Sequence, residues 1–130
     1  MAKLAIKGHA TRGNEVIEIL EMLGGKIRRG RFVGHELSCG YYINADGYIG
    51  FKHYSQFNDA AIFTLEEFLE VFPYRVGDKV QHKGATSCGS VFAVEKMRWV
   101  NNNVEYTVRR LWYNNCRLTF TAGGLQPYKE

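Results

Sequence analysis

Residues 64–73 read Thr-Leu-Glu-Glu-Phe-Leu-Glu-Val-Phe-Pro, and they separate two parts of the chain that have different sequence patterns. Thr64 and Glu67 have the spacing of a capping box, in which the hydroxyl accepts from the Glu67 amide while the carboxylate reaches back to Thr64. The apolar residues that follow recur on one side of a helix, and Pro73 cannot continue it. The stretch therefore predicts a short helix that ends at Pro73, with a module boundary beside it.

The chain after Pro73 consists of short segments rich in β-branched and aromatic residues, with Gly and Asn turns between them. Its predicted strands are residues 76–80, 90–100, 104–111, 115–121 and 125–128. Asn101-Asn102-Asn103 is a natural tight turn between the second and third of these strands. We therefore predict that residues 74–130 form a small β-barrel.

The chain before the capped helix mixes strand and helix patterns. Residues 3–9 alternate as a half-buried strand does, with two lysines on the polar side. Apolar residues recur at helical spacing over residues 16–23, before a pair of glycines. Asp46-Gly47 lies between two aromatic segments and predicts a β-hairpin turn. Residues 1–73 are therefore predicted to be a small α/β module with two helices and a β-hairpin, and the whole chain is α+β.

Composition limits the classes of protein to which the chain can belong. Its 130 residues are 45% hydrophobic, which suffices for one good core or two small cooperating ones. A formal net charge of +4 favours polyanionic partners. The chain shows no signal sequence and no apolar stretch of roughly 20 residues, so we expect a cytoplasmic protein with no membrane partner. Cys39, Cys88 and Cys116 have no CxxC spacing, which predicts reduced thiols.

Two resemblances to known proteins rest on particular segments. The segments of the second module are Val76-Gly77-Asp78-Lys79-Val80, Gly89-Ser90-Val91, Val104-Glu105-Tyr106-Thr107-Val108 and Leu125-Gln126-Pro127. In this order they resemble the strands of SH3-like barrels of the Tudor and KOW type, over Phe72 to Tyr128. That resemblance implies a fold but no single function, because such barrels host nucleic-acid, peptide and structural roles. Residues 5–13, 16–25 and 64–74 resemble uncharacterised proteins of gut bacteria and their phages, which implies a mobile-element origin and no activity.

The segment Gly8-His9-Ala10-Thr11-Arg12-Gly13 lies between the first predicted strand and the first predicted helix. Amides and the positive end of a helix dipole can bind an anion in such a turn. The candidate phosphate ligands here are His9, Thr11, Arg12 and Gly13. Although the glycines have P-loop spacing, Asn14-Glu15 replaces the Lys and the Ser or Thr, which disfavours NTP hydrolysis. The alternative is structural, with the glycines permitting a tight turn and Thr11 or Asn14 capping the helix.

A second candidate site is the basic segment from Lys26 to Arg31, which has four cations in six residues. Its candidate phosphate contacts are Arg28, Arg29 and Arg31. The candidate stacking residues beside them are Tyr41, Tyr42, Tyr48, Phe51 and Tyr54, with Tyr42 and Tyr48 favoured. Together they would resemble the way in which single strands or nucleotide bases are held. The alternative is a solvated basic loop with buried aromatic residues, because alternate residues of a hairpin face the core.

The remaining candidates point to structure rather than chemistry. Trp99, Tyr106, Trp112 and Tyr113 would form a recognition patch only if they converged on one exposed face, and the alternative is that Trp99 and Tyr106 belong to the core. The histidines and cysteines lack the spacing of metal ligands. The glutamates at 66, 67 and 70 are explained by a capped surface helix. We therefore predict no catalytic residue, no metal site and no cofactor.

These observations predict a non-enzymatic binding protein for a phosphate-bearing ligand, with nucleic acid favoured over a small nucleotide. Such binding must weaken as salt rises, because counterions are released from the phosphates. Two alternatives remain open at this stage. One is a protein-interaction adaptor or inhibitor of phage type that docks a partner through the barrel, and the other is a protein that sequesters a nucleotide signal.

Overall fold

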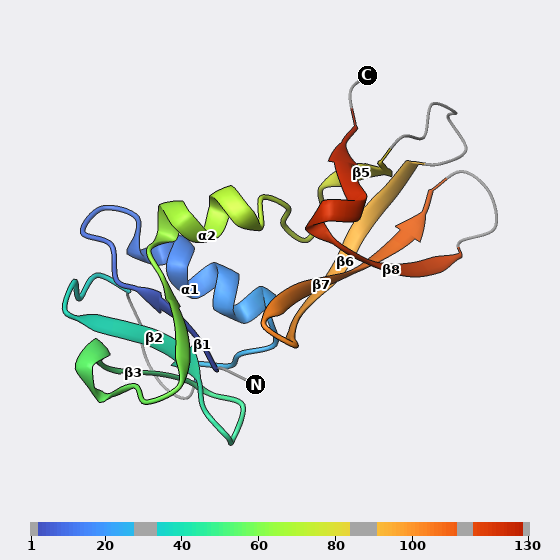
Figure 1. The fold of residues 1–130 in the computed structure, drawn as a ribbon. Helices are drawn as coiled ribbons and strands as arrows, with labels where there is room; N and C mark the ends of the chain where they lie inside the picture. The colour runs from blue at the N-terminus through green and yellow to red at the C-terminus, as the bar shows by residue number, and fades with distance from the viewer. Residues whose placement is uncertain (1–2, 28–33, 84–90, 112–115, 129–130) are drawn as a thin grey trace. The chain divides into compact units, whose positions relative to one another are not determined.

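A computed structural model describes residues 3–27, 34–83, 91–111 and 116–128 (Figure 1). The chain divides into two compact units, Met1–Val71 and Phe72–Glu130. The sequence places the module boundary at Pro73, and the division in the structure falls just before that residue. Neither described helix is long and apolar enough to cross a membrane.

The first unit is built on a four-stranded sheet with the strand order β3-β2-β1-β4. Its elements are β1 (Lys3–Lys7), α1 (Gly13–Met22), β2 (Cys39–Ile43), β3 (Ile49–His53), the 3-10 turn η1 (Tyr54–Gln56), β4 (Ala60–Phe63) and α2 (Leu65–Val71). β1 runs antiparallel to β2 and parallel to β4. The sheet is therefore mixed, and with the two helices it confirms the α+β class.

Both helices of the first unit cover the same face of its sheet (Figure 1). Phe63 lies opposite Ile6, so both side chains point to one face, and the Phe68 ring of α2 meets Phe63 edge-on with centroids 5.9 Å apart. After α1, a Cβ added to Gly25 would lie 2.9 Å from Cγ1 of Ile43, which points to this face too. The other face of the sheet carries neither helix.

Local signals in the first unit have the expected geometry. The Thr64 amide donates to Oε1 of Glu67 over 3.0 Å, and the Glu67 amide donates to Oγ1 of Thr64 over 3.1 Å, so the capping box is confirmed. The β2–β3 hairpin turns at Gly47, whose φ of +86° is one that glycine adopts readily. Asn44 closes this turn, because its Oδ1 accepts from two backbone amides.

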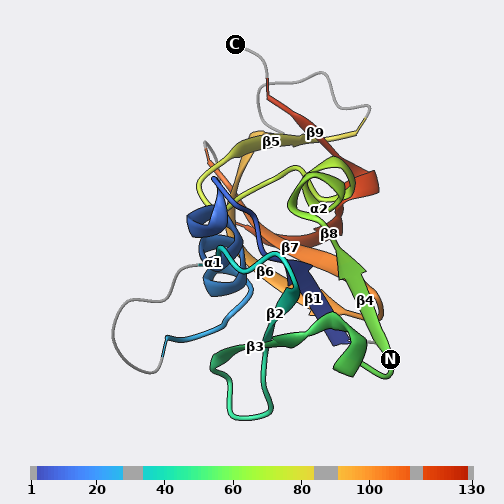
Figure 2. The ribbon, with the colours of Figure 1, turned by 90° about the vertical axis from the view of Figure 1, so that its left-hand side faces the viewer.

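The second unit is a five-stranded antiparallel sheet with the order β8-β7-β6-β5-β9. Its elements are β5 (Lys79–His82), β6 (Val91–Val100), β7 (Asn103–Arg110), β8 (Arg117–Thr121), the 3-10 turn η3 (Ala122–Gly124) and β9 (Leu125–Pro127). Figure 2 shows β5 and β9 side by side. Among the described residues, β8 and β9 are the two edges and do not pair with each other, so the sheet is not closed as a barrel would be.

One turn of the second unit has the conformation that the sequence predicts, whereas another shortens a predicted strand. The β6–β7 hairpin turns at Asn101 and Asn102, whose φ angles of 53° and 61° are left-handed, as expected for an asparagine turn. The strand expected over residues 76–80 instead begins at Lys79. The reason is a tight turn before it, in which the Asp78 amide donates to the Arg75 carbonyl and the Arg75 amide donates to the Asp78 carboxylate.

Of the aromatic residues proposed for a patch on this unit, the structure describes Trp99 and Tyr106, and Tyr106 is not on an exposed face. Tyr106 is fully buried at the centre of the core, where its ring meets that of Tyr74 edge-on at 5.6 Å. Trp99 is half-buried against Phe72, with ring centroids 6.0 Å apart. Tyr106 is therefore a core residue, whereas positions 112 and 113 lie outside the described residues.

Candidate functional site

The turn between β1 and α1 brings His9, Thr11, Arg12 and Gly13 together. Nδ1 of His9 accepts hydrogen bonds from the amides of Thr11 and Arg12, at 3.2 and 3.0 Å. An imidazole nitrogen that accepts has no proton, so Nε2 carries it in the neutral ring and donates to Oε1 of Glu66 over 2.7 Å. The side chain of His9 thus occupies two amides that an anion would otherwise bind.

The remaining groups of this turn also have partners within the protein. The Arg12 guanidinium contacts both carboxylate oxygens of Glu15. A Cβ on Gly13 would lie 2.6 Å from the Gly34 carbonyl carbon, so the neighbouring backbone fills the space beside this glycine. Arg12 is the N-cap residue, and no side chain caps the helix, so the expected cap by Thr11 or Asn14 is wrong. These contacts favour the structural interpretation of the turn, and ligand binding there stays a prediction.

The second candidate site is only partly placed by the structure. Arg28, Arg29 and Arg31 lie outside the described residues. Tyr48 follows the hairpin turn and forms an isolated parallel bridge with Lys26. Tyr42 points instead to the sheet face that carries neither helix.

On that face, basic and aromatic side chains alternate along neighbouring strands. β1 alternates Lys3, Ala5 and Lys7 on one side, with buried Leu4 and Ile6 on the other. The strand register places Lys52 of β3 on the same face, because Gly40 of β2 lies opposite both Lys7 and Lys52. We call this set the basic aromatic face, and its residues are Lys3, Lys7, Tyr42, Lys52, Tyr54 and Phe57.

The ammonium groups of this face lie over its aromatic rings. Nζ of Lys52 is 5.2 Å from the ring centroid of Tyr42 and 4.7 Å from that of Phe57. Nζ of Lys3 is 6.0 Å from Tyr42, and Nζ of Lys7 is 5.0 Å from Tyr54. These distances are those of cation–π contacts, which hold a positive charge next to a stacking surface.

A small residue in β2 leaves room for the Phe57 ring beside the sheet. A Cβ on Gly40 would lie 2.8 Å from Cε2 of Phe57 and 3.3 Å from the Cβ of Ala5, so only glycine leaves room for this ring. The Phe57 ring then meets Tyr42 edge-on, with centroids 5.4 Å apart. The result is a pair of half-buried rings with two lysines, Lys3 and Lys52, beside them.

Negative charge is sparse on this face. Within the described part of the chain, Lys3, Lys7 and Lys52 form no ion pair with a carboxylate. Two carboxylates lie nearby: Glu67 interacts electrostatically with Lys7, and Asp59 lines an open hollow of about 290 Å³. The other residues that line it are Lys3, Lys52, Phe57, Asn58 and Ala60. The face therefore presents rings together with lysines that no carboxylate of the described residues holds in an ion pair.

Sequence reasoning named Tyr42 and Tyr54 as stacking residues but missed Phe57 and the three lysines as parts of a site. The alternation of Lys3 and Lys7 was a visible signal, since two lysines on the polar side of a strand already mark a basic strip. Lys52 and Phe57 gave no such signal, because the β2–β3 register brings Lys52 beside Tyr42 and the connection between η1 and β4 brings Phe57 there.

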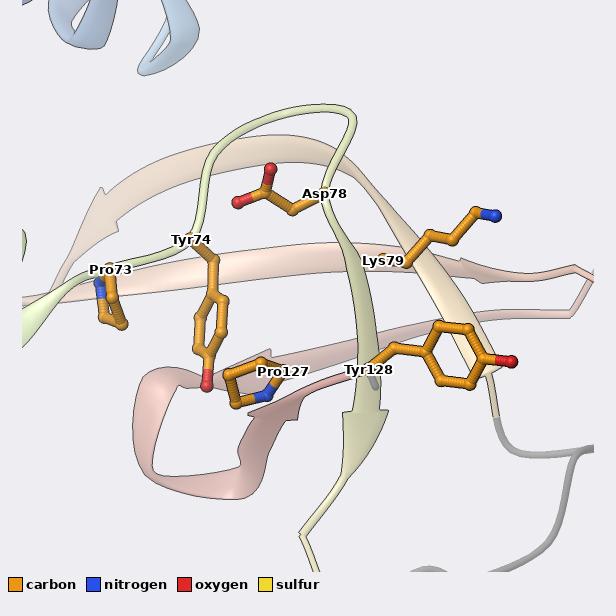
Figure 3. Close-up of a pocket in the computed structure, with 6 residues that line it drawn as sticks. All are labelled: Pro73, Tyr74, Asp78, Lys79, Pro127 and Tyr128. Atoms are coloured by element: carbon orange, nitrogen blue, oxygen red, sulfur yellow. The ribbon is translucent and has the colours of Figure 1, made fainter. Parts of the chain in front are cut away.

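A hollow in the second unit has a different character (Figure 3). Its residues are Pro73, Tyr74, Asp78, Lys79, Pro127 and Tyr128, around a volume of about 420 Å³. Figure 3 shows the Tyr74 ring lying toward Pro127, whereas Lys79 and Tyr128 extend away from it. The Tyr74 hydroxyl donates to the Leu125 carbonyl, and the Asp78 carboxylate accepts from the Arg75 amide. The polar side chains of this hollow therefore do not point toward a common centre, and two of them already have hydrogen-bond partners in the protein.

Comparisons of the chain with protein-family models, with curated proteins and with solved structures find no match.

Proposed function

We propose that this chain is a non-enzymatic nucleic-acid-binding protein and that the basic aromatic face of the first unit contacts the nucleic acid. The observation that carries the proposal is the position of Lys52, whose ammonium lies within about 5 Å of two aromatic rings on a sheet face that carries no helix. Lys3 and Lys7 extend the positive charge along β1, which lies on the far side of β2.

Single strands offer the two groups that this face complements. Their phosphates attract ammonium groups and release counterions when they bind, which makes the affinity depend on salt. Their unpaired bases stack on aromatic side chains, a contact worth about 1–3 kcal/mol for each base. Bases within a duplex are already stacked on one another, so a face that combines rings with lysines favours a single strand over a duplex.

The test is a fluorescence titration of a labelled single-stranded oligonucleotide with the full chain at two salt concentrations. We expect Lys52→Gln to weaken binding and to lower the slope of log affinity against log salt by about 0.7, the contribution of one phosphate contact. Lys83→Gln is the matched control, because Lys83 is exposed and lies in the second unit. Equal affinity at both salt concentrations, or equal losses in the two variants, would contradict the proposal.

Stacking is tested separately from charge. Tyr42→Leu keeps an apolar side chain but removes the ring, so we expect weaker binding with an unchanged salt slope. The same titration of a duplex should give lower affinity than the single strand. A preference for the duplex that survives in Tyr42→Leu would show that the rings do not stack on bases.

We also infer that the second unit has an SH3-like fold. Two observations support this inference: a meander from β5 to β8, and the return of β9 to pair with β5 after the 3-10 turn at Ala122–Gly124. An experimental structure in which β8 and β9 approach and close the sheet would test it.

A further inference from the structure

The sheet of the second unit contains a bulge that turns two consecutive charged residues to the same side. The register of β6 against β7 shifts between Val94 and Lys96, so Glu95 is the extra residue. Val94 and Met97 are both buried, which leaves Glu95 and Lys96 on the outer face of the sheet. Bulges of this kind re-aim side chains and are frequent beside functional sites.

Two arginines on the next strands lie beside this bulge. Arg109 of β7 is directly opposite Arg117 of β8, a pairing of like charges that is unfavourable by itself. Glu95 resolves it, because its Oε1 accepts from Nε of Arg109 and its Oε2 accepts from Nε of Arg117, each over 2.9 Å. Glu95 is therefore a positioning residue that fixes both guanidinium groups.

The Glu95 carboxylate is kept ionised by the same contacts. The hydrogen bond from Arg117 and, after it, the two positive charges hold the pKa of Glu95 below its ordinary value. The clamp on both arginines therefore persists over the whole neutral range of pH. One carboxylate is set against three cations, so the cluster keeps an excess of positive charge.

These side chains line an open groove of about 640 Å³. Its polar residues are Glu95, Lys96, Thr107, Arg109 and Arg117, and its apolar side is formed by Val76, Gly77, Ala93 and Val94. The Arg117 side chain is 62% exposed. Its hydrogen bond to Glu95 uses Nε, so the guanidinium edge formed by its two terminal nitrogens can face a ligand.

We propose that this groove binds a phosphate group. The fixed guanidinium of Arg117 matches the geometry of a phosphate with two parallel hydrogen bonds. The exposed ammonium of Lys96 adds a point charge, and the Thr107 hydroxyl adds a further donor. The site lies entirely in the second unit and does not depend on the basic aromatic face.

The phosphate can come from two sources, a phosphodiester of nucleic acid or a small phosphorylated molecule. The experiment is an NMR titration of the isotope-labelled full chain with inorganic pyrophosphate and, separately, with a short single-stranded oligonucleotide. We expect both probes to shift the amide signals of Lys96, Thr107 and Arg117. Shifts with pyrophosphate alone would identify a small-molecule site, and shifts with the oligonucleotide alone would identify a backbone contact that needs several phosphates.

Variants separate this groove from the proposed function. We expect Arg117→Gln to weaken pyrophosphate binding by about tenfold, because it removes a charged donor pair. Arg98→Gln is the matched control, since Arg98 is also an exposed arginine paired with a glutamate across strands of the same sheet. Lys52→Gln should leave the shifts in this groove unchanged. No shift at millimolar pyrophosphate, or equal losses in Arg117→Gln and Arg98→Gln, would overturn the proposal.

Discussion

The imidazole of His9 and the carboxylate of Glu66 lie 2.7 Å apart and tie the turn after β1 to the first turn of α2. The same ring accepts two backbone amides through Nδ1, so one side chain organises two elements that are far apart in the sequence.

The His9→Ala substitution should therefore destabilise the first unit. It leaves the amides of Thr11 and Arg12 without their acceptor, a loss comparable to that of a helix cap, which costs about 1–2 kcal/mol. His9→Asn offers an acceptor oxygen in a similar place and should recover part of this loss. Urea denaturation followed by circular dichroism measures both variants. Equal stabilities of the Ala and Asn variants would show that the acceptor has no role.

The capping box should make stability depend on pH in the acid range. The hydrogen bond from the Thr64 amide is the main reason that the pKa of Glu67 lies below its ordinary value. A group whose pKa is lowered on folding stabilises the protein above its unfolded pKa, and that contribution is lost as the pH falls through the folded pKa. We therefore expect Glu67→Gln to be less stable than the parent at neutral pH and the difference to shrink at about pH 3.

Glu70→Gln is the control for that experiment, because it removes an exposed charge from the same helix without touching the cap. The comparison is made by urea denaturation at both pH values. A difference between Glu67→Gln and the parent that stays constant from neutral pH to acid would be evidence against the lowered pKa.

Two buried tyrosines should respond differently to loss of the hydroxyl. The Tyr74 hydroxyl donates to the Leu125 carbonyl over 3.0 Å, whereas the Tyr106 hydroxyl is buried with no hydrogen-bond partner among the described residues. Tyr74→Phe should cost about 1 kcal/mol, and Tyr106→Phe should be neutral or stabilising, since it removes a buried polar atom that has no partner. Thermal or urea unfolding distinguishes them, and a larger loss for Tyr106→Phe would reveal a partner for its hydroxyl.

Removing the carboxylate of Asp59 should strengthen nucleic-acid binding. Asp59 lines the hollow that Lys3 and Lys52 share, so it repels a phosphate placed there. Asp59→Asn should raise the affinity for a single-stranded oligonucleotide roughly threefold at low salt, with less effect at high salt. Glu18→Gln is the control, because it removes one exposed carboxylate from α1. An equal gain in both variants would mean that net charge alone sets the affinity.

The sequence by itself determined the local features of this fold. Thr64 and Glu67 form their capping box because both partners lie within one helical turn. Gly47, Asn101 and Asn102 mark hairpin turns because those backbones need left-handed conformations. Each of these features depends on the conformational preference of a few adjacent residues, so the residue types suffice to predict it.

Only the tertiary structure decided where the long-range contacts fall. β4 was not predicted, because Ala60–Phe63 is short and pairs in parallel with β1, more than fifty residues earlier in the chain. Tyr42 was anticipated as a stacking residue, but its neighbours were not. Lys3 and Lys52 meet around it because the strand register aligns them, whereas Phe57 reaches it from the connection between η1 and β4. Register depends on how the whole sheet buries its helix-covered face.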